Sequence, residues 1–344
     1  MMPVFWYTIA VDKMMKNVIH TNFTRDVLES DIPRDVLQIL LADRTTGKNI
    51  MWMTDGYARY ESTFGVKMGV QDEIDVDVIS RPENKIIRPR VDKSKEEQKE
   101  RIKKRAEVFT PSWVCKEMID LPDREIRKST DWRGYIREPA LEITCGEAPF
   151  LASRYDAVSG DMIPVPERIG ILDRKLLAIS KHCRKNAWFE HALAAVRASY
   201  GFEWQGDNLL IARENILASV VEHYWWRWEK IKSTDISGFP RQDFLYAVAE
   251  VISWNLWQMD GLRFVVPMSC HDTVETDLLG TEKRTPCEGC IKKKWGPAAA
   301  DIGPYGECRN IHNGIHCRII LDWDTREKIR FVDIVREGRR EHGR

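Results

Sequence analysis

Helix-like and strand-like segments alternate from residue 106 to about residue 265, and this alternation limits the possible folds more than any other feature of the sequence. Residues 187–200 and 208–228 have the apolar spacing of helices, whereas residues 264–266 are typical of a short strand. Alternating strands and helices pack as a parallel sheet covered by crossover helices. We therefore expect an α/β domain with a largely parallel sheet over residues 106–280.

The two ends of the chain differ in composition from this region. Residues 1–90 combine helix-like apolar spacing at 34–41 with alternating acidic and apolar residues at 74–78, which predicts a small α+β N-terminal lobe. Residues 281–344 are rich in glycine, proline, cysteine and lysine, and a strand-like stretch at 317–323 precedes a basic tail. The sequence thus predicts a lobe, a central domain and a small C-terminal module.

Residues 91–105 connect the lobe to the central domain and contain almost no apolar side chains. Such a segment is typical of a solvated helix or linker. An arm that contacts phosphates is the alternative, because four basic side chains lie next to the start of the central domain. These are Arg101, Lys103, Lys104 and Arg105.

A glycine turn and two acidic residues give the central domain a candidate ligand site. Cys145-Gly146 follows the strand-like stretch that contains Glu142, and a tight turn there lets backbone N–H groups approach a ligand. Glu203 ends a second strand-like stretch, where a carboxylate can accept hydrogen bonds from both hydroxyls of a ribose. These residues predict a ligand site at the carboxyl edge of the sheet.

The order of the motifs over residues 100–265 resembles that of DNA methyltransferases that modify the amino group of adenine. The similar motifs are Phe109-Thr110-Pro111, the Cys145-Gly146 turn, the helix that contains Ile211-Ala212-Arg213, and the segment that ends at Asp260. The resemblance implies a Rossmann-like sheet that binds S-adenosylmethionine, with Asp260 against the adenine. The cofactor-binding residues that it implies are Phe109, Thr110, Pro111, Glu142, Cys145, Gly146, Glu203 and Asp260.

The catalytic signature of that family, Asn or Asp followed by Pro-Pro and an aromatic residue, is absent from this sequence. At the expected distance after Asp260, the resemblance places the flipped target base beside Pro267, Met268 and Ser269. Because a sulfonium is a strong electrophile, positioning supplies most of the rate, and a degenerate signature is compatible with methyl transfer.

The resemblance implies an adenine-directed DNA methyltransferase from a restriction-modification or phage modification system. Its partners would be double-stranded DNA and a restriction-system subunit. Two alternatives stay open: a catalytically silent, methyltransferase-like DNA-binding protein, and an enzyme that methylates RNA or a protein. The chain has 53 basic and 53 acidic side chains, so any DNA-binding surface must come from local clustering.

The C-terminal module predicts a structural zinc site of the zinc-ribbon type. Cys287 and Cys290 are separated by two residues, the spacing with which two thiolates bind one tetrahedral ion. We expect Cys317 and either Cys308 or His312 to complete the ligand set, and four reduced, partly buried thiols are the alternative. Basic neighbours suggest contact with phosphates. These are Lys283, Arg284, Lys292, Lys293 and Lys294.

The compartment is predicted from cysteine usage and from the lack of a targeting signal. No apolar run approaches the roughly 20 residues of a membrane span, and the N-terminus lacks the features of a signal peptide. Eight cysteines among 344 residues favour free thiols or a metal site over a disulfide scaffold. We expect a cytoplasmic protein that does not associate with membranes.

Overall fold

Three short parallel strands form the central sheet. They are β1 (Ala140–Glu142), β2 (Ser199–Glu203) and β3 (Leu256–Gln258), hydrogen-bonded in the order β1-β2-β3. The computed structural model describes residues 32–81, 85–105, 107–230, 234–276, 282–292 and 312–335. Within these ranges β1 is an outer strand of its sheet, and the chain is a mixed α/β protein with a smaller sheet than expected.

The helices that connect the strands pack against this sheet. α8 (Ile171–His182) and α9 (Lys185–Arg197) connect β1 to β2, and α10 (Gly206–Tyr224) and α11 (Gln242–Asn255) connect β2 to β3. α10 is buried at every position, because it packs against α8 and α11 as well as against the sheet. Its side chains form the centre of the main hydrophobic core.

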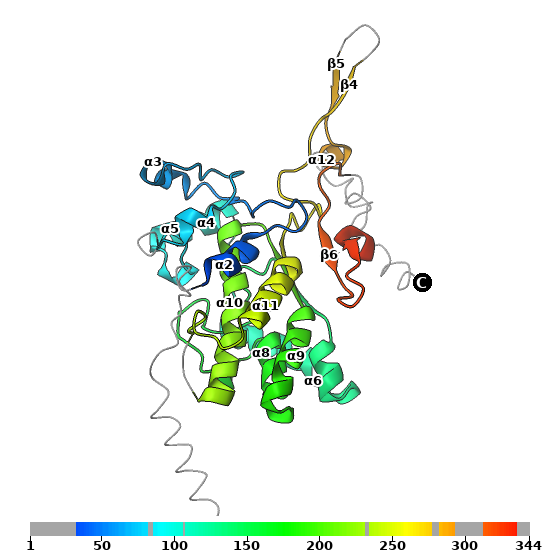
Figure 1. The fold of residues 1–344 in the computed structure, drawn as a ribbon. Helices are drawn as coiled ribbons and strands as arrows, with labels where there is room; N and C mark the ends of the chain where they lie inside the picture. Colours follow the sequence, from blue (N-terminus) through cyan, green and yellow to red (C-terminus); the bar gives the residue numbers. More distant parts are fainter. Residues whose placement is uncertain are drawn as a thin grey trace, which may run out of the picture.

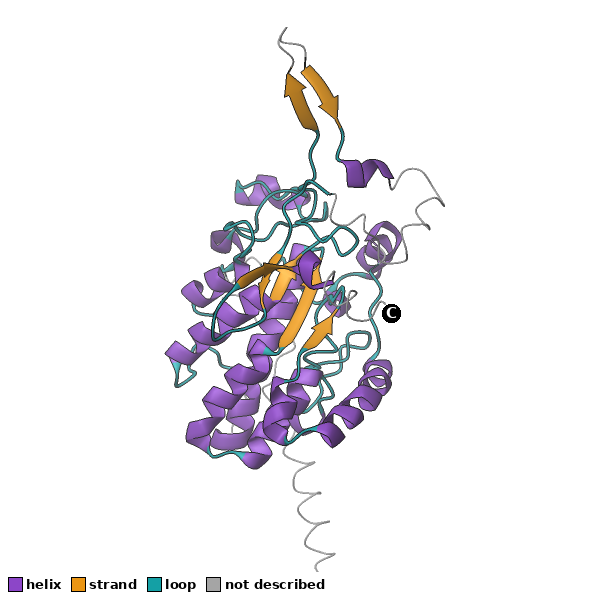
Figure 2. Ribbon diagram, turned by 90° about the vertical axis from the view of Figure 1, so that its right-hand side faces the viewer, coloured by secondary structure: helices purple, strands orange, loops and turns teal. Residues whose placement is uncertain are grey.

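The C-terminal part of the chain covers the opposite face of the sheet. β6 (Arg318–Ile320) and β7 (Lys328–Arg330) form an antiparallel ribbon, followed by a helical turn at 331–335. Apolar side chains of this segment, among them Ile319 and Phe331, form a second core with Tyr200, Phe202 and Trp257. Figure 2 shows this ribbon beside the strands of the sheet. The residues after 312 therefore complete the sheet domain as well as contributing to the cysteine-rich region.

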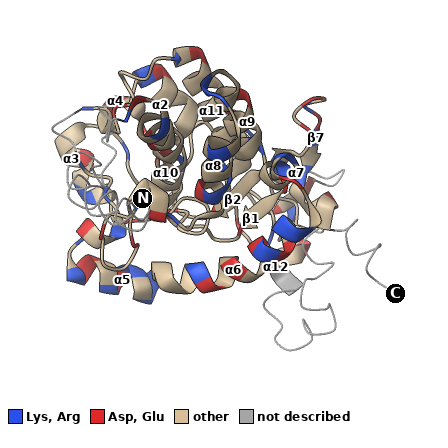
Figure 3. Ribbon diagram, turned by 90° about the horizontal axis from the view of Figure 1, so that it is seen from below, with Lys and Arg blue, Asp and Glu red and all other residues tan. Residues whose placement is uncertain are grey.

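The segment before the sheet contributes mainly helices. They are α2 (Arg34–Leu41), α3 (Glu61–Phe64), α4 (Val76–Ile79), α5 (Lys95–Arg105), α6 (Ser112–Ser129) and α7 (Trp132–Arg137). α2 packs against α10 and α11, so its buried side chains belong to the same core as the helices of the sheet domain. Along α5 and α6, basic and acidic residues are mixed (Figure 3).

The predicted helix at 34–41 is confirmed as α2, and the charged stretch at 91–105 contains the helix α5. The strand predicted at 74–78 is wrong, because Asp75 accepts a hydrogen bond from the N–H of Asp77 at 2.7 Å and starts α4 instead. Residues 264–266 form only isolated bridges through Val265.

A two-stranded ribbon extends away from the rest of the chain (Figures 1 and 2). It consists of β4 (Thr273–Thr276) and β5 (Glu282–Thr285), and all eight of these residues are exposed. α12 (Glu288–Lys292) follows it directly. None of the helices that the structure describes combines the length and the apolar character needed to cross a bilayer.

Candidate functional site

A cleft of about 750 Å³ opens beside the carboxyl ends of β1 and β2. In α/β proteins ligands bind at this edge of a parallel sheet. Six of the eight cofactor-binding residues expected from the sequence line the cleft. These are Phe109, Thr110, Glu142, Cys145, Gly146 and Glu203.

The Cys145-Gly146 turn joins the ends of the two strands. The N–H of Cys145 donates to the carbonyl oxygen of Phe202 at 2.9 Å, and the N–H of Gly146 donates to Glu203 Oε2 at 2.9 Å. Gly146 has a φ of 54°, and a Cβ atom there would lie 3.2 Å from the ring of Phe109. Both the backbone conformation and the contact with Phe109 therefore favour glycine at this position.

Glu142 and Glu203 are buried carboxyls that are bonded only by backbone N–H groups among the described residues. Glu142 accepts from Phe150 and Leu151 at 3.2 and 3.0 Å, whereas Glu203 accepts from Gly146 and Gln205. Burial raises the pKa of Glu142 to about 8. The two N–H bonds lower this pKa, whereas the nearby charge of Glu203 raises it further. Burial raises the pKa of Glu203 as well.

A hydrogen-bonded network beside these carboxyls centres on Glu107, which the sequence did not mark as a site residue. Glu107 Oε2 accepts from Arg101 Nε at 2.7 Å, from Gln205 Nε2 at 2.9 Å and from Asn208 Nδ2 at 3.3 Å. Arg101 also pairs with Asp207 at 2.9 Å, and Lys93 pairs with the same carboxylate at 3.3 Å. These two cations thus pair with Glu107 and Asp207. Neither of them pairs with Glu142 or Glu203.

Two acceptor oxygens of this network lack a donor. Glu107 Oε1 and Gln205 Oε1 are both buried, and no hydrogen-bond donor among the described residues reaches either of them. Each unpaired buried oxygen costs roughly 1–3 kcal/mol of folding free energy. Both residues line the cleft, so this cost falls at the point where a ligand would bind.

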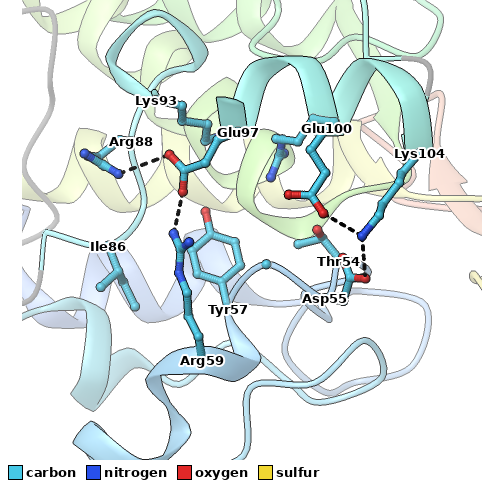
Figure 4. Close-up of a pocket in the computed structure, with 12 residues that line it drawn as sticks. Thr54, Asp55, Tyr57, Arg59, Ile86, Arg88, Lys93, Glu97, Glu100 and Lys104 are labelled. Atoms are coloured by element: carbon cyan, nitrogen blue, oxygen red, sulfur yellow. Dashed lines mark hydrogen bonds and ion pairs between the residues drawn. The ribbon is translucent and has the colours of Figure 1, made fainter. Parts of the chain in front are cut away.

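A second, smaller cavity of about 310 Å³ adjoins the first, and Lys104 lines both. Charged side chains that line this cavity form ion pairs with one another (Figure 4). Glu97 pairs with Arg59 and with Arg88, and Lys104 pairs with Glu100 at 2.6 Å and with Asp55 at 3.7 Å. An anion that bound here would have to displace these ion pairs. The cations of this cavity are therefore not free to form an anion-binding site.

Two of the expected cofactor residues lie outside the cleft lining. Pro111 precedes α6, where its carbonyl oxygen accepts from the N–H of Val114 and Cys115. The carboxylate of Asp260 accepts from the N–H of Leu262 at 2.9 Å and pairs with Arg263 at 3.3 Å. Asp260 therefore stabilises its own turn after β3, and its contact with adenine stays a prediction.

The expected catalytic residues Pro267, Met268 and Ser269 also lie outside the cleft lining. Ser269 Oγ donates to the carbonyl oxygen of Val266 at 2.7 Å and accepts from the N–H of Ile315 at 2.9 Å. The segment thus holds the chain that leads to the cysteine cluster. A target-base site at these residues stays a prediction.

Three cysteines and one histidine form a compact cluster at the base of the β4–β5 ribbon. Cys270, Cys287, Cys290 and His312 bring one ligand atom each to within 4.8 Å of all the others. The Sγ atoms lie 3.5, 3.6 and 3.7 Å from His312 Nδ1, in the same order. Ligand atoms around a tetrahedral zinc ion are about 3.5–3.8 Å apart, so this Cys3His cluster could hold a metal such as zinc.

The expected ligand set is corrected at Cys317. This thiol is buried in the second core, where its Sγ faces the carbonyl oxygen of Gln258 at 3.5 Å. Cys270 takes the place that was expected for Cys317. Cys287, Cys290 and His312 agree with the prediction. Cys308 lies outside the described residues. The imidazole of His312 packs over Gly289, where a Cβ atom would lie 2.7 Å from it. Glycine between the two cysteines is therefore required by the histidine.

Comparison with known proteins adds no relative to this description. No family model matches the chain, and no curated protein or solved structure is significantly similar to it.

Proposed function

We propose that the cleft binds S-adenosylmethionine and that the protein is a methyltransferase-like protein directed at adenine in double-stranded DNA. The observation that carries the proposal is the hydrogen bond from the N–H of Gly146 to Glu203 Oε2. It joins the glycine turn after β1 to the acid after β2 over a single cleft. In this proposal Glu203 accepts the ribose hydroxyls, and the turn approaches the ligand with its backbone.

The charge of the cleft supports a cationic ligand. Glu142 and Glu203 have no cationic partner among the described residues, so a phosphate-bearing cofactor would meet two buried carboxyls. S-adenosylmethionine carries a positive sulfonium, which makes its methyl group electrophilic, and a positive ammonium group. Either charge would lower the cost of ionising these carboxyls.

The sheet and the cysteine cluster extend the proposal. The order β1-β2-β3 agrees with one half of a doubly wound, Rossmann-like sheet. Lys103 lines the cleft and supplies positive charge for the DNA backbone, and a restriction-system subunit is the proposed protein partner. We assign a structural zinc ion to the Cys3His cluster, since four protein ligands leave no open position for catalysis.

A catalytically silent, DNA-binding protein is the second candidate. The observation that favours it is the position of Pro267, Met268 and Ser269 beside the cysteine cluster. In this position the segment 267–269 does not offer the cleft a hydrogen-bond acceptor for the amino group of a target base. This candidate predicts DNA binding without methyl transfer.

Calorimetric titration of the zinc-loaded protein with S-adenosylmethionine tests the proposed ligand. We expect micromolar affinity, and we expect Glu203→Gln to bind at least tenfold more weakly, a loss of about 1.4 kcal/mol. Glu190→Gln, an exposed change on α9, serves as the control and should bind like wild type. A labelled-methyl assay on unmodified DNA then separates the enzyme from the silent protein. Absence of binding by the folded wild type would refute the proposal.

A further inference from the structure

The wall of the cleft contains two acceptor oxygens that belong to neighbouring side chains and that both lack a donor. Glu107 Oε1 and Gln205 Oε1 are buried, and their residues are only 7% and 4% exposed. Both residues line the cleft. A buried acceptor without a donor is uncommon in folded proteins, and these two belong to residues that line a cleft which a ligand could fill.

The hydrogen bonds of the network determine which oxygen of each side chain is left without a donor. Gln205 Nε2 donates to Glu107 Oε2 at 2.9 Å, and Arg101 Nε donates to the same oxygen at 2.7 Å. If the amide of Gln205 were turned round, its oxygen would face this carboxylate oxygen and repel it. The network therefore leaves the other oxygen of each side chain unpaired.

Water or a ligand that donates can satisfy the two oxygens, and the chemistry of the oxygens restricts which ligand groups are suitable. A phosphate, a carboxylate or a carbonyl group has no hydrogen to give, and a hydroxyl has one. An amino or ammonium group has at least two N–H bonds and can serve both acceptors. The terminal torsions of Glu107 and Gln205 are broad, so a small rotation can turn either oxygen toward the cleft.

We propose that Glu107 Oε1 and Gln205 Oε1 form a paired acceptor site for an amino or ammonium group of the ligand in this cleft. The inference rests on the proposed function for the identity of that ligand. S-adenosylmethionine carries two suitable groups, the amino group of the purine and the ammonium group of its amino-acid part. Adenosine carries only the first, which allows the two sources to be distinguished.

The test is calorimetric titration of wild type, Glu107→Gln and Gln205→Met with S-adenosylmethionine and with adenosine. Glu107→Gln can keep the acceptor that faces Arg101 while it replaces Oε1 by an N–H donor. Gln205→Met removes the second acceptor with little change of volume. Glu96→Gln, an exposed change on α5, is the control. Thermal unfolding identifies any variant that does not fold, in which case the other variant decides.

We expect both variants to lose at least tenfold in affinity while the control stays within about twofold of wild type. A loss for both ligands assigns the site to the purine amino group, and a loss for S-adenosylmethionine alone assigns it to the ammonium group. If both variants bind S-adenosylmethionine like wild type, the acceptor site is refuted and the proposed function stands. If wild type binds adenosine alone and the variants lose it, the acceptor site stands and the proposed function fails. If wild type binds neither ligand, or binds adenosine alone and the variants retain it, both are refuted.

Discussion

Glu142 is a carboxyl group whose charge depends on what fills the cleft. Its raised pKa of about 8 means that the folded state binds a proton more tightly than the unfolded chain does. Glu142 therefore destabilises the empty protein progressively as the pH rises from about 4.5 to about 8. A cationic ligand reverses this effect, because it favours the ionised form.

The residue-scale prediction is that S-adenosylmethionine binding releases protons. Because Glu142 must ionise when the cation binds, affinity should increase from about pH 6 to about pH 8, by at most roughly tenfold per pH unit. Titrations in buffers of different ionisation enthalpy measure the number of protons released. Glu142→Gln should remove this proton release, and equal heats in all buffers for wild type would contradict the prediction.

Single residues also mark the limit of what the sequence could predict. The cleft residues Glu142, Cys145, Gly146 and Glu203 were predicted because each lies in a local motif at the end of a strand. Cys270 was missed, since it is far from the Cys287-x-x-Cys290 motif in sequence and has no motif of its own.

At the scale of elements, α10 connects the fold to the cleft. Its first residue, Gly206, donates its N–H to the carbonyl oxygen of Trp52 at 3.0 Å. A Cβ atom at Gly206 would lie 2.0 Å from the carbonyl oxygen of Met51, which is backbone and cannot rotate away. Glycine at this position therefore lets the N-terminus of α10 approach the segment 50–53 and places Gln205 in the cleft wall.

We predict that Gly206→Ala lowers the free energy of unfolding by about 1–3 kcal/mol, because α10 or the segment that contains Met51 must shift. The same shift should weaken ligand binding through Gln205. Urea denaturation measures the first effect. Gly56→Ala is the matched control, since a Cβ atom there meets only Thr54 Oγ1 at 3.8 Å, and it should change stability by less than about 0.5 kcal/mol. Equal stability of the two variants would argue against the close approach.

Elements were predicted well where their pattern is local and poorly where distant contacts decide. The helix at 34–41 has a clear apolar face, and α2 has those bounds. The helix predicted to reach residue 200 ends at Arg197, because Ser199 begins β2 and pairs with β1. The link between Glu107 and Gln205 spans 98 positions and has no signature in the sequence.

At the scale of the whole molecule, the Cys3His cluster lies apart from the main core. None of its four ligands belongs to the hydrophobic cluster that surrounds α10. An isolated two-stranded ribbon is marginally stable in water, so we expect a metal ion bound by the Cys3His cluster to stabilise β4 and β5. Removal of such an ion should therefore affect the ribbon far more than the sheet domain.

We predict that a chelator, or Cys270→Ser, removes one equivalent of zinc and increases protease cleavage within the β4–β5 ribbon. The midpoint of thermal unfolding of the core should change little. Metal analysis and limited proteolysis measure the two expected effects. Cys317→Ser is the control, because that thiol lies in the second core and should leave the zinc content unchanged. Full zinc occupancy in Cys270→Ser would show that the ligand set is wrong.

The ribbon is joined to the molecule by Cys270 on one side and Cys287 on the other. Both ends of the ribbon meet at the Cys3His cluster, and none of the four residues of this cluster belongs to the main core. A change in the length of the ribbon should therefore leave the packing of the core unchanged. Insertions and deletions between these two cysteines would lengthen or shorten its reach without disturbing the helices or the sheet. In the laboratory this ribbon is therefore the natural position at which to graft a new recognition hairpin.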